Sequence, residues 1–128
     1  MPEVLSPDQI ASYNENGYLV LENQVPADWI AKIRDEIARF ETEAATMTTS
    51  NDRLDLEDSH TPQEPRLRRI KLPHTISDVV SELMYSDHIL APARDLIGPD
   101  LRLHTTKLNM KSASYGAAVE WHQDYAFY

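Results

Sequence analysis

The chain has 128 residues, no cysteine and a net charge of −9 from 21 acidic and 12 basic side chains, and 41% of its residues are hydrophobic. This length and composition predict a single folded domain, and the lack of cysteine excludes a disulfide framework, a thiolate metal site and a cysteine nucleophile. The acidic balance disfavours nucleic acid as a partner, no apolar run is long enough to span a membrane, and no signal-peptide pattern is visible. We therefore expect a cytoplasmic protein that binds neither nucleic acid nor membrane.

Residues 1–45 predict a helix, a strand and a second helix. Ser6 suits an N-cap, and Gln9 three positions later completes a capping box at the start of the first helix. Gly17 suits the left-handed position that ends a helix. The apolar run YLVLE, residues 18–22, then predicts a short strand.

The second helix is expected over residues 25–44, and its apolar residues repeat at helical spacing. They are Ile30, Ile33, Ile37 and Phe40. Residues 46–65 are polar, contain two prolines and show little periodicity. A connection of this length inside a compact domain is either a mobile surface loop or a lid over a site, and the sequence favours neither.

Residues 66–128 are expected to hold strands and helices. The segment RLRRIKL, residues 66–72, predicts a strand with four basic residues among its seven. A solvated edge strand is the favoured interpretation, and contact with an anionic ligand is the alternative. Residues 76–85 and 88–97 predict two helices, followed by a turn at Gly98-Pro99-Asp100.

The last third of the chain predicts an antiparallel hairpin. Its first strand covers residues 101–111, in which Leu108 and Met110 alternate with polar side chains. Those polar side chains are Lys107, Asn109 and Lys111. Residues 112–117 form the loop and residues 118–125 the second strand. In this register Lys107 would lie across from His122 on the same face.

His122 and Asp124 are the residues with a clear chemical signal. On a strand, side chains two positions apart project to one face, so the imidazole and the carboxylate could reach one ion. A nitrogen and an oxygen donor suit Fe(II), Mn(II) or Zn(II) better than Ca²⁺. The alternative is a hydrogen-bonded His–Asp pair at a strand end, and two protein ligands alone are too few for a tight site.

Two stretches of the chain resemble the phytanoyl-CoA dioxygenase-like family. They are LSPDQIASYNENGYLVLENQVPADWIAKIRDEI near the N-terminus and KLNMK…AVEWHQDYAFY at the end, with the W-H-x-D stretch that carries the family's first two metal ligands. Residues 46–100 add nothing distinctive. The resemblance implies an α+β protein on a double-stranded β-helix scaffold (the jelly-roll, cupin-like fold) with N-terminal helices packed on the sheet. It also implies a non-haem Fe(II)- and 2-oxoglutarate-dependent oxygenase.

In such a site His122 and Asp124 would be two members of a 2-His-1-carboxylate triad. The co-substrates would be 2-oxoglutarate and O₂, and a small organic molecule would be hydroxylated as 2-oxoglutarate is converted to succinate. The carboxylate at Asp124 favours hydroxylation over halogenation. Candidate side chains for 2-oxoglutarate are Asn109 and Lys107, whose alternative is an ordinary solvated face. Candidates for contact with the substrate are Trp121, Tyr125 and Lys111.

In members of the family, a second histidine and an arginine that binds 2-oxoglutarate lie well downstream of the W-H-x-D stretch. The sequence up to Tyr128 does not include them. We therefore expect an N-terminal part of such an oxygenase, truncated after the H-x-D strand, that binds Fe(II) weakly and does not turn over. His104 could act as a third ligand, although a surface role is more common for such a residue. The alternatives are a non-catalytic truncated relative that acts as a binding or scaffold protein, and a cupin-like metal protein that does not use 2-oxoglutarate. Exposed strand edges would favour self-association.

Overall fold

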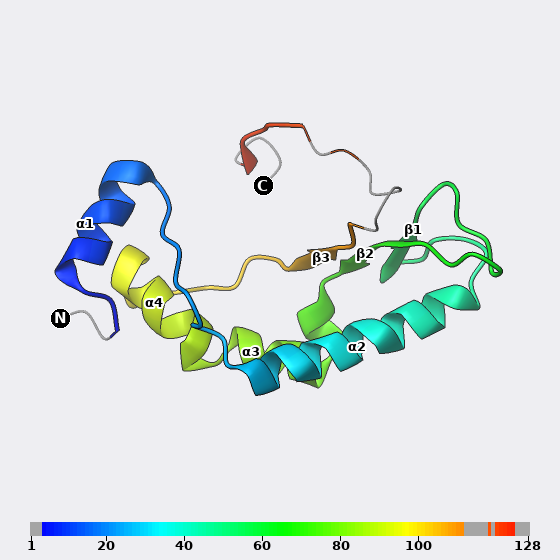
Figure 1. Ribbon diagram of the computed structural model, residues 1–128, viewed down its shortest axis with the longest axis horizontal. Helices are drawn as coiled ribbons and strands as arrows, with labels where there is room; N and C mark the ends of the chain where they lie inside the picture. The colour runs from blue at the N-terminus through cyan, green and yellow to red at the C-terminus, as the bar shows by residue number, and fades with distance from the viewer. Residues whose placement is uncertain (1–3, 112–117, 119, 125–128) are drawn as a thin grey trace.

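The computed structural model describes residues 4–111, 118 and 120–124, in which helices lie against a small antiparallel sheet (Figure 1). The α-helices are α1 (Pro7–Asn16), α2 (Ala27–Ala45), α3 (Asp78–Met84) and α4 (Asp87–Ile97), with a 3₁₀ helix η1 at Pro73–Thr75. The strands are β1 (Leu54–Leu56), β2 (Leu67–Lys71) and β3 (Lys107–Asn109). The predicted α+β class is confirmed, because the described residues form helices and an antiparallel sheet. Among these residues no helix is both long and apolar enough to cross a membrane.

Helix α1 has the ends that its sequence predicts. The Ser6 hydroxyl accepts a hydrogen bond from the Gln9 N–H at 3.2 Å, and the Gln9 side chain accepts one from the Ser6 N–H at 2.8 Å. This reciprocal pair satisfies two of the amide groups that a helix start leaves without partners. At the other end Gly17 adopts φ 79° and donates its N–H to the Tyr13 carbonyl.

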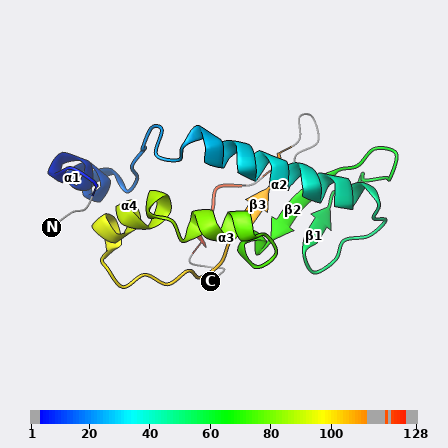
Figure 2. The same ribbon diagram turned by 90° about the horizontal axis from the view of Figure 1, so that it is seen from below.

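The start of the chain is tied to α4. The N–H groups of Val4 and Leu5 both donate to the Asp95 carboxylate, each at 2.8 Å. Seen from below, α1 lies beside α4 at the end of the molecule away from the sheet (Figure 2). The predicted helices over 76–85 and 88–97 are confirmed as α3 and α4, and the Ser77 hydroxyl caps the first of them.

The core forms where α2 crosses one face of the sheet. The fully buried Phe40 packs with Ala44 of the same helix and with buried leucine and isoleucine side chains from β1 and β2. The members from the strands are Leu54, Leu56, Leu67 and Ile70, and the partly buried Leu108 and Met110 extend the cluster. The predicted apolar stripe of α2 is therefore confirmed at its C-terminal half, while Ile30 at the other end stays 40% exposed.

The sheet has the order β1-β2-β3 with both pairs antiparallel. One row across it joins Asp55, Arg69 and Asn109, and the next row on the same face pairs Lys71 with Lys107. Strand β2 is thus the central strand, which corrects the expectation of a solvated edge strand at residues 66–72. Its basic side chains lie between two neighbours instead of along an open margin.

The expected strand at residues 18–22 is wrong, and the stretch 46–65 holds a strand that the sequence did not indicate. Residues 18–22 form no strand, and Tyr18 and Val20 are 68% and 72% exposed. A strand requires a hydrogen-bonded neighbour, and the described residues provide none for this apolar run. Conversely, the stretch 46–65 contains β1, which alternates buried Leu54 and Leu56 with the half-buried residue between them. Whether the rest of this stretch is a surface loop or a lid stays a prediction.

The predicted C-terminal hairpin is also wrong. Within residues 101–111 only Lys107–Asn109 forms a strand, and it pairs with β2. Residues 118 and 120–124 are not in a strand, and the loop expected at 112–117 lies outside the described residues. The five-residue β2 already has its apolar face against α2, so β3 extends a packed sheet instead of starting a separate hairpin.

Candidate metal and co-substrate site

The predicted metal ligands lie close together in the C-terminal segment. His122 Nε2 is 3.3 Å from Asp124 Oδ1, although the segment is not a strand. The His122 Nδ1–H donates to the Glu120 carbonyl at 2.7 Å, because a carbonyl oxygen can only accept. A protonated ring would donate from Nε2 to the carboxylate at this distance, and a neutral ring with its proton on Nδ1 would present the Nε2 lone pair to a metal ion shared with Asp124.

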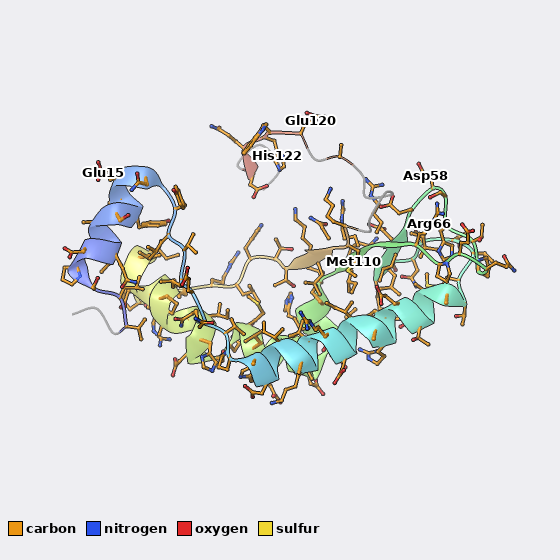
Figure 3. All side chains as sticks on the ribbon, in the orientation of Figure 1. Glu15, Asp58, Arg66, Met110, Glu120 and His122 are labelled. Atoms are coloured by element: carbon orange, nitrogen blue, oxygen red, sulfur yellow. The ribbon has the colours of Figure 1, made fainter. Side chains whose placement is uncertain are left out.

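The separation of these two donor atoms also fits one metal ion. Metal bonds of about 2.1 Å to an imidazole nitrogen and a carboxylate oxygen, at roughly a right angle, place the two donors about 3 Å apart. Both side chains are solvent-accessible, at 41% for His122 and 70% for Asp124. Figure 3 shows His122 on the side of the sheet that faces away from α2. The residues present therefore fit two of the ligands of a mixed nitrogen–oxygen metal site.

A third protein ligand is not found within residues 4–111, 118 and 120–124, where no three His, Cys, Asp or Glu side chains come together. His104 is exposed and precedes β3, so it does not lie on a strand beside His122 as expected. Other histidines have structural roles. His60 bridges the Met47 carbonyl at Nε2 and the Arg66 N–H at Nδ1, with both distances 2.9 Å. His122 and Asp124 thus lie together, and the described residues place no third protein ligand beside them.

The polar face of the sheet, opposite the side that Phe40 packs against, carries a concentration of basic side chains. Asp55 Oδ1 lies 2.9 Å from Lys71 Nζ and its Oδ2 lies 3.7 Å from Arg69 Nη1. Arg69 Nε also donates to Asn109 Oδ1 at 3.3 Å. We call this surface the basic face, and define it by Asp55, Arg69, Lys71, Lys107, Asn109 and Lys111.

The side chains predicted to contact co-substrate or substrate are placed as follows. Lys107 and Asn109 are exposed on the basic face, and Lys111 continues their alternation, which confirms the predicted polar side of this strand. Lys107 lies opposite Lys71, however, and not opposite His122. Trp121 is fully exposed at 102%. Tyr125 lies outside the described residues.

The sequence indicated the basic residues of 66–72, but it did not place them beside β3 and gave no signal for Asp55 of β1. Arg69 and Lys71 are two positions apart in a strand, a spacing that could have indicated a shared face. Asp55 sits between two leucines in a three-residue strand, too short a pattern to separate from loop sequence. At the end of the basic face a small cavity of about 50 Å³ is lined by Arg69, Asn109 and Lys111, together with Glu57, Arg68, Met110 and Ala118.

Helices packed on one face of an antiparallel sheet, beside a His–x–Asp donor pair, are the features expected of a non-haem metal oxygenase. Comparison with known protein families supports this class. The family described as Phytanoyl-CoA dioxygenase (PhyH) matches residues 13–128, and the chain belongs to it. The family resemblance seen in the sequence is therefore confirmed.

The relatives are named as dioxygenases of small molecules. The chain is 34% identical over 121 residues to a probable alpha-ketoglutarate-dependent hypophosphite dioxygenase of Stutzerimonas stutzeri, covering 94% of this chain and 42% of that protein. It is 27% identical over 123 residues to the ectoine dioxygenase of Bordetella parapertussis, covering 96% and 38%. The chain thus spans about two fifths of the length of these relatives.

A solved structure shows the same arrangement of elements. The crystal structure of EctD from S. alaskensis with bound Fe is similar with a TM-score of 0.76 and 27% identity, over 94% of this chain and 41% of that one. The fold of the described residues is therefore that of part of an iron-containing relative.

Proposed function

We propose that this chain supplies metal ligands and one wall of the active site of an Fe(II)- and 2-oxoglutarate-dependent dioxygenase. The reaction would hydroxylate a small organic substrate while 2-oxoglutarate is converted to succinate and CO₂. The observation that carries the proposal is the 3.3 Å approach of His122 Nε2 and Asp124 Oδ1 in a chain of the Phytanoyl-CoA dioxygenase family. We further propose that the three-stranded sheet belongs to a jelly-roll scaffold, with α2 packed on its outer face.

His122 and Asp124 would hold the iron, which when bound together with 2-oxoglutarate and O₂ supplies the oxidation of a substrate C–H bond. The hydrogen bond from His122 Nδ1–H to the Glu120 carbonyl fixes the ring tautomer and keeps Nε2 available as a donor. Asp124 contributes a negative charge to the ion, and its presence favours hydroxylation over halogenation.

Lys107 and Asn109 are the proposed contacts for a carboxylate of 2-oxoglutarate. A lysine ammonium and an amide N–H can both donate to a carboxylate oxygen, and the bond from a charged donor is the stronger. Both side chains are exposed on the face that α2 leaves uncovered. Trp121, Tyr125 and Lys111 are proposed to lie toward the substrate. The cytoplasmic location and self-association through strand edges stay predictions.

The test is metal binding by the 128-residue chain under anaerobic conditions, with Mn(II) and Fe(II) titrated by calorimetry. His122→Ala and Asp124→Ala should each weaken binding by at least about tenfold, since each removes one of two donors. His104→Ala is the matched control, because it removes an exposed histidine outside the pair. Equal affinity of all four proteins would refute the proposal.

Succinate release should be measured alongside, with Fe(II), ascorbate and 2-oxoglutarate. Two protein donors within the described residues predict weak metal binding and little turnover by this chain. Robust release that is lost in His122→Ala would show that a third ligand comes from elsewhere in the chain or from a second copy.

A further inference from the structure

Asn16 and Gly17 form the one asparagine–glycine pair in the sequence, and they lie where α1 ends. Asn16 is the last residue of the helix, and Gly17 follows it in the left-handed conformation with φ 79° and ψ 4°. An asparagine before a glycine is prone to spontaneous deamidation, because glycine has no side chain to hinder attack by its own backbone nitrogen. Both residues are exposed to solvent.

This reaction needs only water as a reagent. The Gly17 nitrogen loses its proton to solvent and bonds to Cγ of Asn16, and the Cγ–Nδ2 bond breaks so that Nδ2 leaves as ammonia. Water then opens the resulting cyclic imide at either of its carbonyl groups. The product at position 16 is an aspartyl residue, or an isoaspartyl residue in which the main chain passes through the side-chain carbons. No electrons are exchanged.

The folded end of α1 keeps the two reacting groups apart. The Gly17 N–H donates to the Tyr13 carbonyl at 2.8 Å, so this nitrogen is engaged in the helix cap. Asn16 Nδ2 donates to the Ser12 carbonyl at 2.9 Å and to the Ser12 hydroxyl at 3.2 Å, which turns the side-chain amide back along the helix and away from Gly17. Ring closure also requires Asn16 to leave its helical backbone conformation. The reaction therefore requires the end of α1 to open first.

Little packing opposes such an opening. None of the ten residues of α1 is buried, and a helix of this length is marginal in water without tertiary contacts. Beyond Gly17, residues 18–22 are not in a strand, and Tyr18 and Val20 are 68% and 72% exposed. The helix is held at its start, where two backbone N–H groups donate to Asp95 of α4.

We propose that Asn16–Gly17 is a site of spontaneous deamidation whose rate is set by the local opening of α1. Only the fraction of molecules in which the helix end is open exposes the Gly17 nitrogen and frees the Asn16 amide. This chemistry involves neither His122 nor Asp124, so it is independent of the proposed oxygenase function.

The modified residue cannot rebuild the end of the helix. A carboxylate at position 16 has no N–H to donate to the Ser12 carbonyl, and it adds negative charge where the helix dipole is already negative. The last turn of α1 has no basic side chain to offset that charge. An isoaspartyl linkage also lengthens the main chain by one carbon atom ahead of Gly17, and so displaces the N–H that caps the Tyr13 carbonyl. Modification thus makes a reversible opening of α1 permanent.

The experiment incubates the purified 128-residue chain at mildly alkaline pH, both folded and in urea, and follows position 16 by peptide mapping with mass spectrometry. In urea Asn16 should be modified well before Asn14, which lies in the same helix but is followed by Glu15. The folded chain should react on the order of tenfold more slowly than the unfolded chain, because only its opened fraction is reactive.

Ser6→Ala tests the role of opening, because Ser6 caps the end of α1 opposite the reacting atoms. Its loss should speed the reaction of the folded chain about fivefold, the change that corresponds to the usual cost of removing an N-cap, and should leave the rate in urea unchanged. Ser50→Ala is the matched control, since the Ser50 hydroxyl accepts the Leu56 N–H at 2.9 Å beside the sheet. Asp95→Ala removes both docking hydrogen bonds and should also speed the reaction.

Equal rates in the folded and unfolded chain would overturn the proposal, as would equal rates in folded Ser6→Ala and Ser50→Ala. So would a folded chain in which Asn16 is modified no faster than Asn14. The modified chain can be separated by its extra negative charge on an anion-exchange column. It should show faster amide exchange across α1 while the amides around Phe40 keep their protection, and unchanged exchange in α1 would refute the predicted loss of the helix end.

Discussion

Replacing Phe40 by alanine tests how far the packing of α2 on the sheet stabilises the chain. The Phe40 side chain is fully buried, at 0% exposure, in the cluster that includes Leu54 and Ile70. Truncation removes the buried ring and leaves a cavity that the surrounding side chains fill only in part. Such a change costs about 3–5 kcal/mol, a large share of the roughly 5–15 kcal/mol by which small domains are stable.

Urea unfolding followed by circular dichroism measures this loss as a shift of the midpoint at constant slope. Ile30→Ala is the matched control, because Ile30 lies on the same helix but is 40% exposed. Its cost should be about 1 kcal/mol or less, since part of the side chain already contacts water. Similar losses for the two variants, or a Phe40→Ala loss below about 1 kcal/mol, would show that the α2–sheet contact is not the main core.

Three smaller changes test local structure, each by the same unfolding assay. Ser6→Ala removes the capping hydroxyl of α1 and should cost about 1 kcal/mol, so an unchanged stability would contradict the capping role. Gly17→Ala should cost about 1–2 kcal/mol from left-handed backbone strain alone, because an added Cβ meets nothing within 4 Å; Gly17→Asn should cost less. His60→Phe leaves the Met47 carbonyl and the Arg66 N–H without their ring partners and should cost about 1–3 kcal/mol. A loss below about 0.5 kcal/mol would mean that water replaces both bonds.

Signals within one element could be predicted from the sequence, and those between elements could not. The ends of α1 follow from Ser6, Gln9 and Gly17 because capping and left-handed geometry act over three or four residues. Residues 18–22 have strand-like composition, but a strand also needs a neighbour that composition does not specify. For the same reason β1 was missed, since its three residues become a strand only through pairing with β2.

The candidate site shows the same division. The closeness of His122 and Asp124 could be predicted from their spacing, and the structure brings Nε2 and Oδ1 to 3.3 Å without the strand geometry that suggested it; their role as metal ligands stays a prediction. The basic side of β3 followed from its alternation. Its pairing with Lys71 did not, because the register between β2 and β3 depends on how both strands pack against α2.

The two hydrogen bonds to Asp95 lie in a part of the molecule apart from the Phe40 cluster. This carboxylate accepts the N–H groups of Val4 and Leu5, 91 and 90 residues earlier in the chain, and so joins the start of α1 to α4. No residue of α1 itself is buried, and α2 with the sheet holds the Phe40 cluster at the other end of the molecule. Because α1 buries no residue of its own, we expect its amide protons to exchange through a local opening that leaves the Phe40 cluster closed, with the Asp95 hydrogen bonds adding to the free energy of that opening.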